Sequence, residues 1–208
     1  MIMVQFLGVF LLNYYFLFPI GNNPTGTIPG PGKEFYVDEY EITNLAWREF
    51  LFFMEQKDSN NLSNLLPDSA SWHKVYSGDY LKPNDFDYYP VVGIDFFQVS
   101  RFCEWRSEVV SKRTGKEIIY YLPSKEEFNL AVEFFNNNEF IAKLSDVHII
   151  DKKNKVKGLC SNVSEMTNVE GYAMGANWNS ESGTCDLQST YNKNSEYLGF
   201  RCFAKFVK

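Results

Sequence analysis

The stretch PVVGIDFFQVSRFCEWRSEVVSKRTGK, residues 90–116, gives the clearest sign of local structure in the chain. Asp95, followed three residues later by Gln98, has the pattern of a capping box, in which two side chains satisfy the first free backbone groups of a helix. Apolar residues then recur near the helical period, and Gly115 can end the helix in a left-handed conformation. The stretch therefore predicts a long amphipathic helix with Cys103 on or near its buried face.

A strand and a second helix are predicted before this stretch. EFYVDEYEIT, residues 34–43, alternates apolar and polar side chains, which is typical of a strand with one buried face. Asn44 can then cap a helix over residues 45–56. From residue 57 to residue 89 the chain is polar and shows no sustained period, but its aromatic side chains need burial and indicate a packed loop.

Further elements are predicted after the long helix. EIIYYLP, residues 117–123, indicates a strand, and Ser124 with Glu127 forms a second capping box at the start of a shorter helix. The C-terminal stretch YLGFRCFAKFV, residues 197–207, indicates a final strand. Together the elements predict an α+β fold with two main helices, short antiparallel strands and long ordered loops.

The composition fits one globular domain and argues against nucleic acid as a partner. The chain has 208 residues, of which 17% are aromatic, and its formal net charge is -6. A chain of this length can bury one core, and the aromatic content is far above that of a disordered protein. No cluster of lysines and arginines is dense enough to neutralise a row of phosphates.

The N-terminal residues 1–20 contain no charged side chain. Such a run is typical of a secretory signal or a membrane anchor, although a basic start and a small-residue cleavage site are both missing. Residues 21–32 are rich in Gly, Pro and Asn and are interpreted as a linker to a domain over residues 33–208. We therefore expect an exported protein of the periplasm or cell envelope, with residues 1–20 as a potential membrane tether.

The four cysteines lie far apart in the sequence, which argues against a structural zinc site. An even number of cysteines in an exported chain favours two disulfides. The chain has only two histidines, His73 and His148, so it cannot supply a site that needs three.

Four segments in a fixed order resemble one known family. They are YVDEYEITNLAWREF, YPVVGIDFFQVSRFCEWRSE, LPSKEEFNLAV and SNVSEMT…GYAMGANW…LGFRCF, and they span about residues 34–206. In this order they resemble the formylglycine-generating enzymes, also called sulfatase-modifying factors, whose fold is a variant of the C-type lectin fold. The FCEWR helix, the NVSEMT turn and the LPDSASW loop are most similar to gliding-motility and type IX secretion lipoproteins.

The resemblance implies that both chemistries of the family are lost. The copper-dependent enzymes carry two cysteines, two and seven residues after the aromatic of an active-site strand; counted from Trp178, these positions are Ser180 and Cys185. A serine hydroxyl cannot serve as a soft anionic ligand at neutral pH, so copper is not expected. A second branch of the family needs three histidines for iron.

The resemblance also bears on disulfides and calcium. Cys103 and Cys202 match a pair that is bridged in several family members, whereas Cys160 and Cys185 could form a second bridge or leave Cys185 free. Asn162 and Glu165 match a turn that often supplies calcium ligands. Backbone hydrogen bonds could equally satisfy that turn.

The expected function is therefore an exported, non-catalytic domain that acts in binding or cell-envelope assembly. An envelope protein or a glycan would be its partner. Two alternatives remain open at this point: a metal-dependent oxidoreductase that uses Cys185, and a lectin-like binding protein with a variable surface over residues 177–195.

Overall fold

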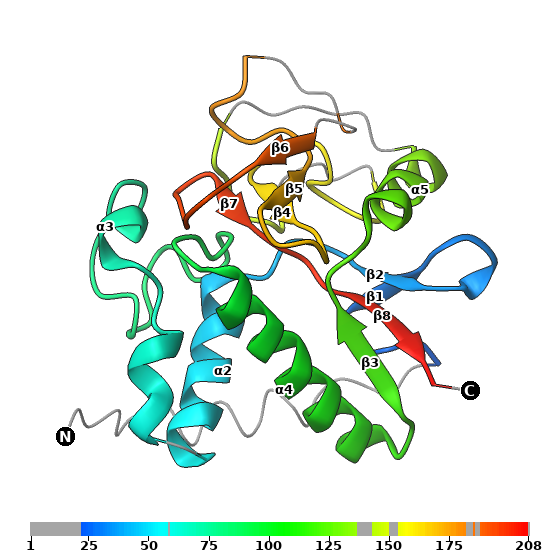
Figure 1. The fold of residues 1–208 in the computed structure, drawn as a ribbon, viewed down its shortest axis with the longest axis horizontal. Coiled ribbons are helices and arrows are strands. Elements are labelled where there is room, and N and C mark those ends of the chain that lie inside the picture. The colour runs from blue at the N-terminus through cyan, green and yellow to red at the C-terminus, as the bar shows by residue number, and fades with distance from the viewer. Residues whose placement is uncertain are drawn as a thin grey trace.

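A computed structural model describes residues 22–57, 59–136, 143–149, 154–181, 185 and 188–207. In this part of the chain, helices and short strands alternate in an α+β arrangement (Figure 1). The elements in chain order are β1 (Thr27–Pro29), η1 (Pro31–Lys33), β2 (Tyr36–Asp38), α2 (Asn44–Lys57), η2 (Ser59–Leu65), α3 (Ser69–Trp72), α4 (Phe96–Thr114), β3 (Ile118–Tyr121), α5 (Lys125–Phe135), β4 (Ser164–Met166), β5 (Tyr172–Met174), β6 (Gln188–Thr190), β7 (Leu198–Gly199) and β8 (Phe203–Phe206).

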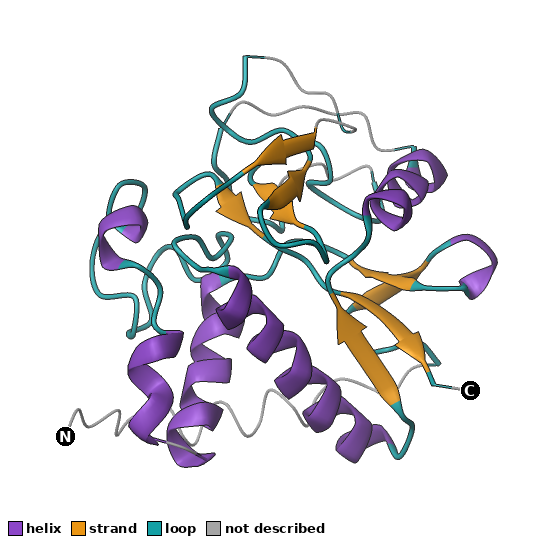
Figure 2. Cartoon of the chain, in the orientation of Figure 1, coloured by secondary structure: helices purple, strands orange, loops and turns teal. Residues whose placement is uncertain are grey.

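The described strands form two four-stranded sheets. The first sheet has the order β1-β2-β8-β3 with antiparallel neighbours, so the C-terminal strand β8 lies between β2 and β3, which come much earlier in the chain. The second sheet has the order β6-β5-β4-β7, in which β4 and β7 are parallel. The second sheet lies at the end of the molecule opposite the C-terminal ends of α2 and α4 (Figure 2).

Helix α4 confirms the prediction made from residues 90–116. The Asp95 carboxylate accepts a hydrogen bond from the Gln98 backbone N–H at 2.8 Å, and the Gln98 side chain accepts one from the Asp95 N–H at 2.9 Å. At the other end Gly115 has a φ of 67°, a left-handed conformation that glycine adopts without steric cost. The helix thus begins and ends where the sequence indicates.

Two serines of α4 satisfy the free edge of strand β3. The Ser107 hydroxyl accepts a hydrogen bond from the Tyr120 N–H at 2.8 Å, and the Ser111 hydroxyl accepts one from the Ile118 N–H at 2.9 Å. Serines four residues apart lie one helical turn apart, which matches the step between alternate residues of the strand. The helix therefore covers an edge that would otherwise expose unpaired backbone groups.

Aromatic side chains pack α2 and α4 together and against the strands. The Trp47 ring stacks on Phe102 with 5.5 Å between centroids, and Phe102 meets the edge of Phe200 at 5.3 Å. These three side chains are at most 1% exposed. The high aromatic content of the sequence therefore serves the core.

Helix α2 is capped one residue earlier than the sequence indicates. The Thr43 hydroxyl accepts a hydrogen bond from the Ala46 N–H at 3.2 Å, whereas Asn44 lies inside the helix. The Asn44 side chain instead accepts from the Trp72 indole at 3.1 Å and donates to the Phe86 carbonyl at 3.0 Å. Asn44 thus joins α2 to the loop that contains α3.

At both ends of the described chain the structure differs from the sequence prediction, which was a linker over residues 21–32 and one strand over residues 197–207. Within residues 21–32, Thr27–Pro29 form β1 and pair with β2. The predicted strand over residues 197–207 is split into β7 and β8, which belong to different sheets. Arg201 lies between them and is fully buried, so the chain changes sheets around a buried charge. Residues 1–20 lie outside the described residues.

Candidate functional site

Cys185 is bonded to Cys160 beside the second sheet. Cys160 is fully buried and directly precedes the turn that leads into β4. A sulfur in a disulfide is not a thiolate, so Cys185 in this state can neither attack a substrate nor bind copper. Of the two alternatives that the sequence leaves open for Cys185, the structure has the bridge.

The position of the second family thiol is occupied by a serine with a local structural role. The Ser180 hydroxyl accepts a hydrogen bond from the Asn177 N–H at 3.0 Å, while the Ser180 N–H donates to the Asn177 carbonyl at 2.9 Å. These two bonds close a tight turn around Trp178. Copper chemistry therefore lacks both of its thiolates here, and no catalytic step can be derived through a copper ion.

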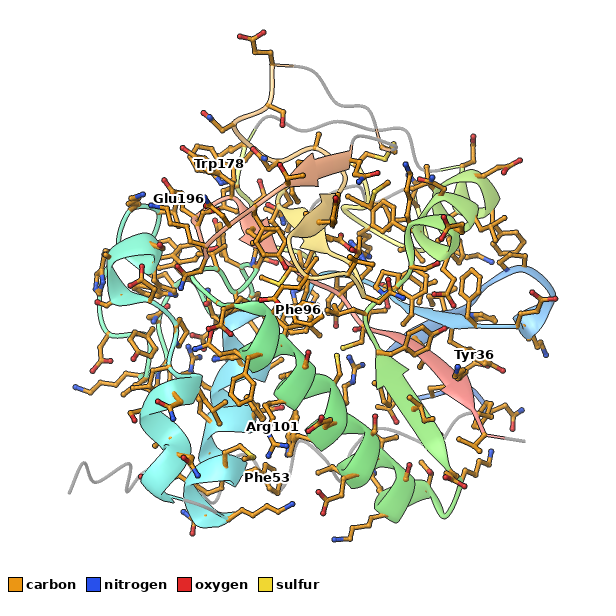
Figure 3. The ribbon with its side chains drawn as sticks, in the orientation of Figure 1. Tyr36, Phe53, Phe96, Arg101, Trp178 and Glu196 are labelled. Atoms are coloured by element: carbon orange, nitrogen blue, oxygen red, sulfur yellow. A yellow bond between two sulfur atoms is a disulfide. The ribbon has the colours of Figure 1, made fainter. Side chains whose placement is uncertain are left out.

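Trp178 lies in a small patch of aromatic and charged side chains at this end of the molecule. Its ring packs on Tyr197 with 4.9 Å between centroids, and its indole N–H donates to the Glu196 carbonyl at 3.3 Å. The Glu196 carboxylate accepts from the Lys74 ammonium at 3.0 Å, which brings in the segment after α3. Figure 3 shows Trp178 and Glu196 close together above the helices. We call Lys74, Trp178, Glu196 and Tyr197 the distal patch.

Glu165 and Asn162, the residues that match a calcium-binding turn, are occupied by other partners. Both carboxylate oxygens of Glu165 accept from the Arg201 guanidinium, at 2.6 to 2.8 Å. The Asn162 side chain bonds the backbone of Ser145 through its oxygen and its nitrogen. Among the described residues no group of three or more His, Cys, Asp or Glu side chains could hold a metal ion. These two residues therefore do not fit a calcium site.

A second buried carboxylate, Glu41, lies beside this ion pair and was not identified from the sequence. Its oxygens have no hydrogen-bond partner, and the Arg201 Nη2 lies 4.0 Å away. Gly158, with a φ of +75°, packs directly on the carboxyl group, where any side chain would collide. Burial raises the pKa of Glu41 to about 8; Arg201 acts against this rise and the neighbouring Glu165 carboxylate adds to it. Burial therefore favours the neutral form of Glu41.

The predicted bridge between Cys103 and Cys202 is not formed, which corrects that expectation. Both residues are buried free cysteines, with their Sγ atoms 3.6 Å apart. This separation fits a weak hydrogen bond between two thiols and exceeds the roughly 2 Å of a disulfide bond. Burial raises the pKa of the Cys202 thiol well above its ordinary value, so the pair behaves as core and not as a nucleophile.

The two histidines lie in different environments. His73 follows α3 and bonds Ser69 and the Gly78 carbonyl, whereas His148 contacts Asp146 and the Tyr40 and Tyr88 rings. They share no partner among these residues. The structure therefore does not place the two histidines together as ligands of one iron ion.

Comparison with known proteins places this geometry in a family. Residues 23–188 match the model of the sulfatase-modifying factor enzyme 1-like domain. The crystal structure of CarF is similar with a TM-score of 0.54 and 11% identity, over 84% of this chain and 87% of CarF. Treponema denticola variable protein 1 gives a TM-score of 0.49 and 14% identity, over 81% and 84% of the two chains.

No curated protein matches the sequence. The family model, by contrast, covers well over half of the chain, and the likeness to CarF supports the same fold. The α+β arrangement with short strands and long loops is that of the C-type lectin-like fold, as the sequence predicted. The chain therefore belongs to the family of sulfatase-modifying factor enzyme 1-like domains.

Proposed function

We propose that this protein is an exported, non-catalytic member of the family that acts in binding or in cell-envelope assembly, as gliding-motility and type IX secretion lipoproteins do. One observation carries the proposal: Cys185, the remaining candidate nucleophile, is bonded to Cys160, and Ser180 stands where a second thiol would be required. The fold keeps its family shape while both reactive positions serve structure.

Export is supported by the disulfide and by the N-terminal sequence. Disulfides persist in oxidising compartments outside the cytosol. Residues 1–20 carry no charge and have the composition of a signal or anchor. No helix within the described ranges is both long and apolar enough to cross a membrane.

The distal patch is the surface that we propose for the partner. It combines two aromatic rings, which contact each other, with an ion pair, and aromatic rings supply much of the binding energy at protein and glycan interfaces. The Lys74 side chain is 58% exposed and can reach a partner without rearrangement. A cell-envelope protein or a glycan would suit such a surface.

The experiment that tests the loss of catalysis is a thiol map. The purified full chain is denatured and alkylated with and without prior reduction, and the peptides are assigned by mass spectrometry. We expect Cys103 and Cys202 to be alkylated without reduction, and Cys160 and Cys185 only after it.

A second measurement tests directly whether the protein is a copper-dependent enzyme. Copper(I) is titrated into the oxidised and the reduced protein, with Cys185→Ser as the matched control, and a cysteine peptide is monitored for conversion to formylglycine. Copper binding that depends on Cys185, together with peptide conversion, would establish catalysis and refute the proposal.

A further inference from the structure

A groove between the C-terminal halves of α2 and α4 has no role in the site described above. It has a volume of about 550 Å³ and lies at the end of the molecule opposite the distal patch (Figure 3). Its apolar wall includes Phe53, Trp105 and Val109, and its rim carries charged side chains. We call this feature the basal groove.

The rim of the basal groove is positive in an otherwise acidic protein. Among the described residues that line it, Lys57, Lys112 and Arg113 are cations and Glu108 is the one carboxylate, whereas the whole chain has a net charge of -6. Glu108 is shared between Lys57 at 2.9 Å and Lys112 at 3.3 Å, so it offsets only part of the positive charge. The Lys57 and Lys112 side chains remain 64% and 79% exposed.

Residues just beyond the C-terminal end of α4 add exposed side chains of both charges to this end. Lys116 follows α4 and lies over the Phe206 ring at 5.5 Å. Glu117 is the nearest exposed acid in sequence. Phe53 is 36% and Val207 39% exposed, so apolar surface accompanies the cations.

The N-terminal segment joins the domain near this groove. The Thr25 carbonyl accepts hydrogen bonds from Arg106 of α4 and from the Tyr120 hydroxyl, both at 2.9 Å. Arg106 and Arg113 are seven residues apart, on the same side of α4 and separated by about 10 Å along its axis. The five steps along the chain from residue 20 to Thr25 can span at most roughly 18 Å. An anchor in residues 1–20 would therefore hold the basal groove close to the bilayer.

We propose that the basal groove docks on the anionic headgroups of the membrane, with Phe53 in the interfacial layer and Lys57, Lys112 and Arg113 on the lipid phosphates. This inference rests on the membrane tether of the proposed function. Anionic lipids complement the positive rim, and apolar side chains flanked by cations are typical of membrane-contacting surfaces. In this orientation the distal patch points away from the membrane.

Vesicle partition of the full chain tests the proposal. Flotation is compared on phosphatidylcholine vesicles and on vesicles with added phosphatidylglycerol, and the ratio of the two partition coefficients is the readout. K112E/R113E should lower this ratio by about 30-fold or more, since each cation contributes on the order of 1 kcal/mol. The matched control K82E/K193E changes two exposed lysines outside the groove and should leave the ratio within about twofold.

A fluorescent probe at the groove separates the tether from the docking. Phe53→Cys labelled with a polarity-sensitive dye should shift to the blue on anionic vesicles only, and K112E/R113E should abolish the shift. Binding to both vesicle types without any shift would leave the tether standing and overturn the docking. No binding to either vesicle type would overturn both. A dye that is already shielded in buffer would mean that protein covers the groove, which also overturns the docking.

Discussion

The two sheets of this protein are stabilised by different means. The first sheet packs against α2 and α4 through aromatic rings such as Trp47 and Phe102, and its edge is bonded by serines of α4. The second sheet has strands of two or three residues in its described part, a disulfide beside it and the buried Glu165–Arg201 ion pair beneath it.

The difference lies in how many contacts support each sheet. Aromatic packing is distributed over many contacts, whereas the second sheet depends on a few specific groups. Two of these groups are Ser180, which closes a turn, and Cys185, which closes a disulfide. In the proposed function these are the positions of the enzymes' two thiols, and here both support the short strands locally.

The largest expected effect comes from removing the guanidinium that joins the two sheets. Arg201→Ala should lower the free energy of unfolding by about 4 kcal/mol, because it leaves Glu165 buried without a counter-ion. Arg201 also donates to the backbone carbonyls of Asp38 and Lys157. Urea denaturation monitored by tryptophan fluorescence measures the change.

Arg201→Met supplies the control for lost packing, since it keeps much of the side-chain volume without the charge. The double variant R201M/E165M should recover part of the loss, because a buried pair replaced by apolar side chains no longer leaves a charge uncompensated. A loss below about 1 kcal/mol in Arg201→Ala would show that the ion pair does not support the second sheet.

Removing the disulfide should have the next largest effect. The bridge closes a separation of 25 residues, for which the chain-entropy model gives about 3 kcal/mol. C160S/C185S, or reduction of the wild-type chain, should lower the free energy of unfolding by this amount. C103S/C202S is the matched control, because it removes two free cysteines and no disulfide. A reductant should lower the free energy of unfolding of this variant by the same amount as that of the wild-type chain.

The first sheet was the easier of the two to predict from sequence. Asp95 and Ser124 lie next to helices whose capping boxes involve residues three apart, and such local patterns are visible in the sequence itself. The aromatic core follows from composition and helical periodicity. The prediction of Asn44 as the helix cap was wrong, because the Asn44 side chain binds partners that are 28 and 42 residues away in the sequence.

The candidate site was harder to predict because its contacts are distant in the sequence. Arg201 lies in a mostly apolar run that predicts one strand. Its partner Glu165 is 36 residues away in the sequence, and in the structure the predicted strand is divided around Arg201 into β7 and β8 of two different sheets. A charge between buried Phe200 and Cys202 was the available signal. For the cysteines the resemblance indicated the Cys103–Cys202 bridge, but pairing depends on sulfur geometry that a sequence does not contain.

Glu41 provides a pH test of the same region. Its ordinary pKa of 4.5 in the unfolded chain rises to about 8 in the folded protein. Between these two values the folded state holds more protons, so the free energy of unfolding should fall as the pH rises. Glu41→Gln cannot ionise and should be more stable than wild type near pH 8, with a difference that grows as the pH rises from 4.5.

Denaturation curves at several pH values between 4.5 and 8 measure this effect. Glu39→Gln is the matched control, since Glu39 is 40% exposed and pairs with Lys157 at the surface. Parallel pH profiles for wild type and Glu41→Gln would contradict a neutral buried Glu41.

The smallest effect is expected at the distal patch. Lys74→Ala should change the free energy of unfolding by about 1 kcal/mol or less, because the Lys74 side chain is 58% exposed and its ion pair with Glu196 is screened by solvent. The exposed pair Lys57–Glu108 offers the matched control, in Lys57→Ala. If Lys74→Ala instead costs as much as Arg201→Ala, the patch is part of the support of the second sheet. A small loss means that the surface can vary without unfolding the domain, which is what the proposed partner-binding role of the distal patch requires.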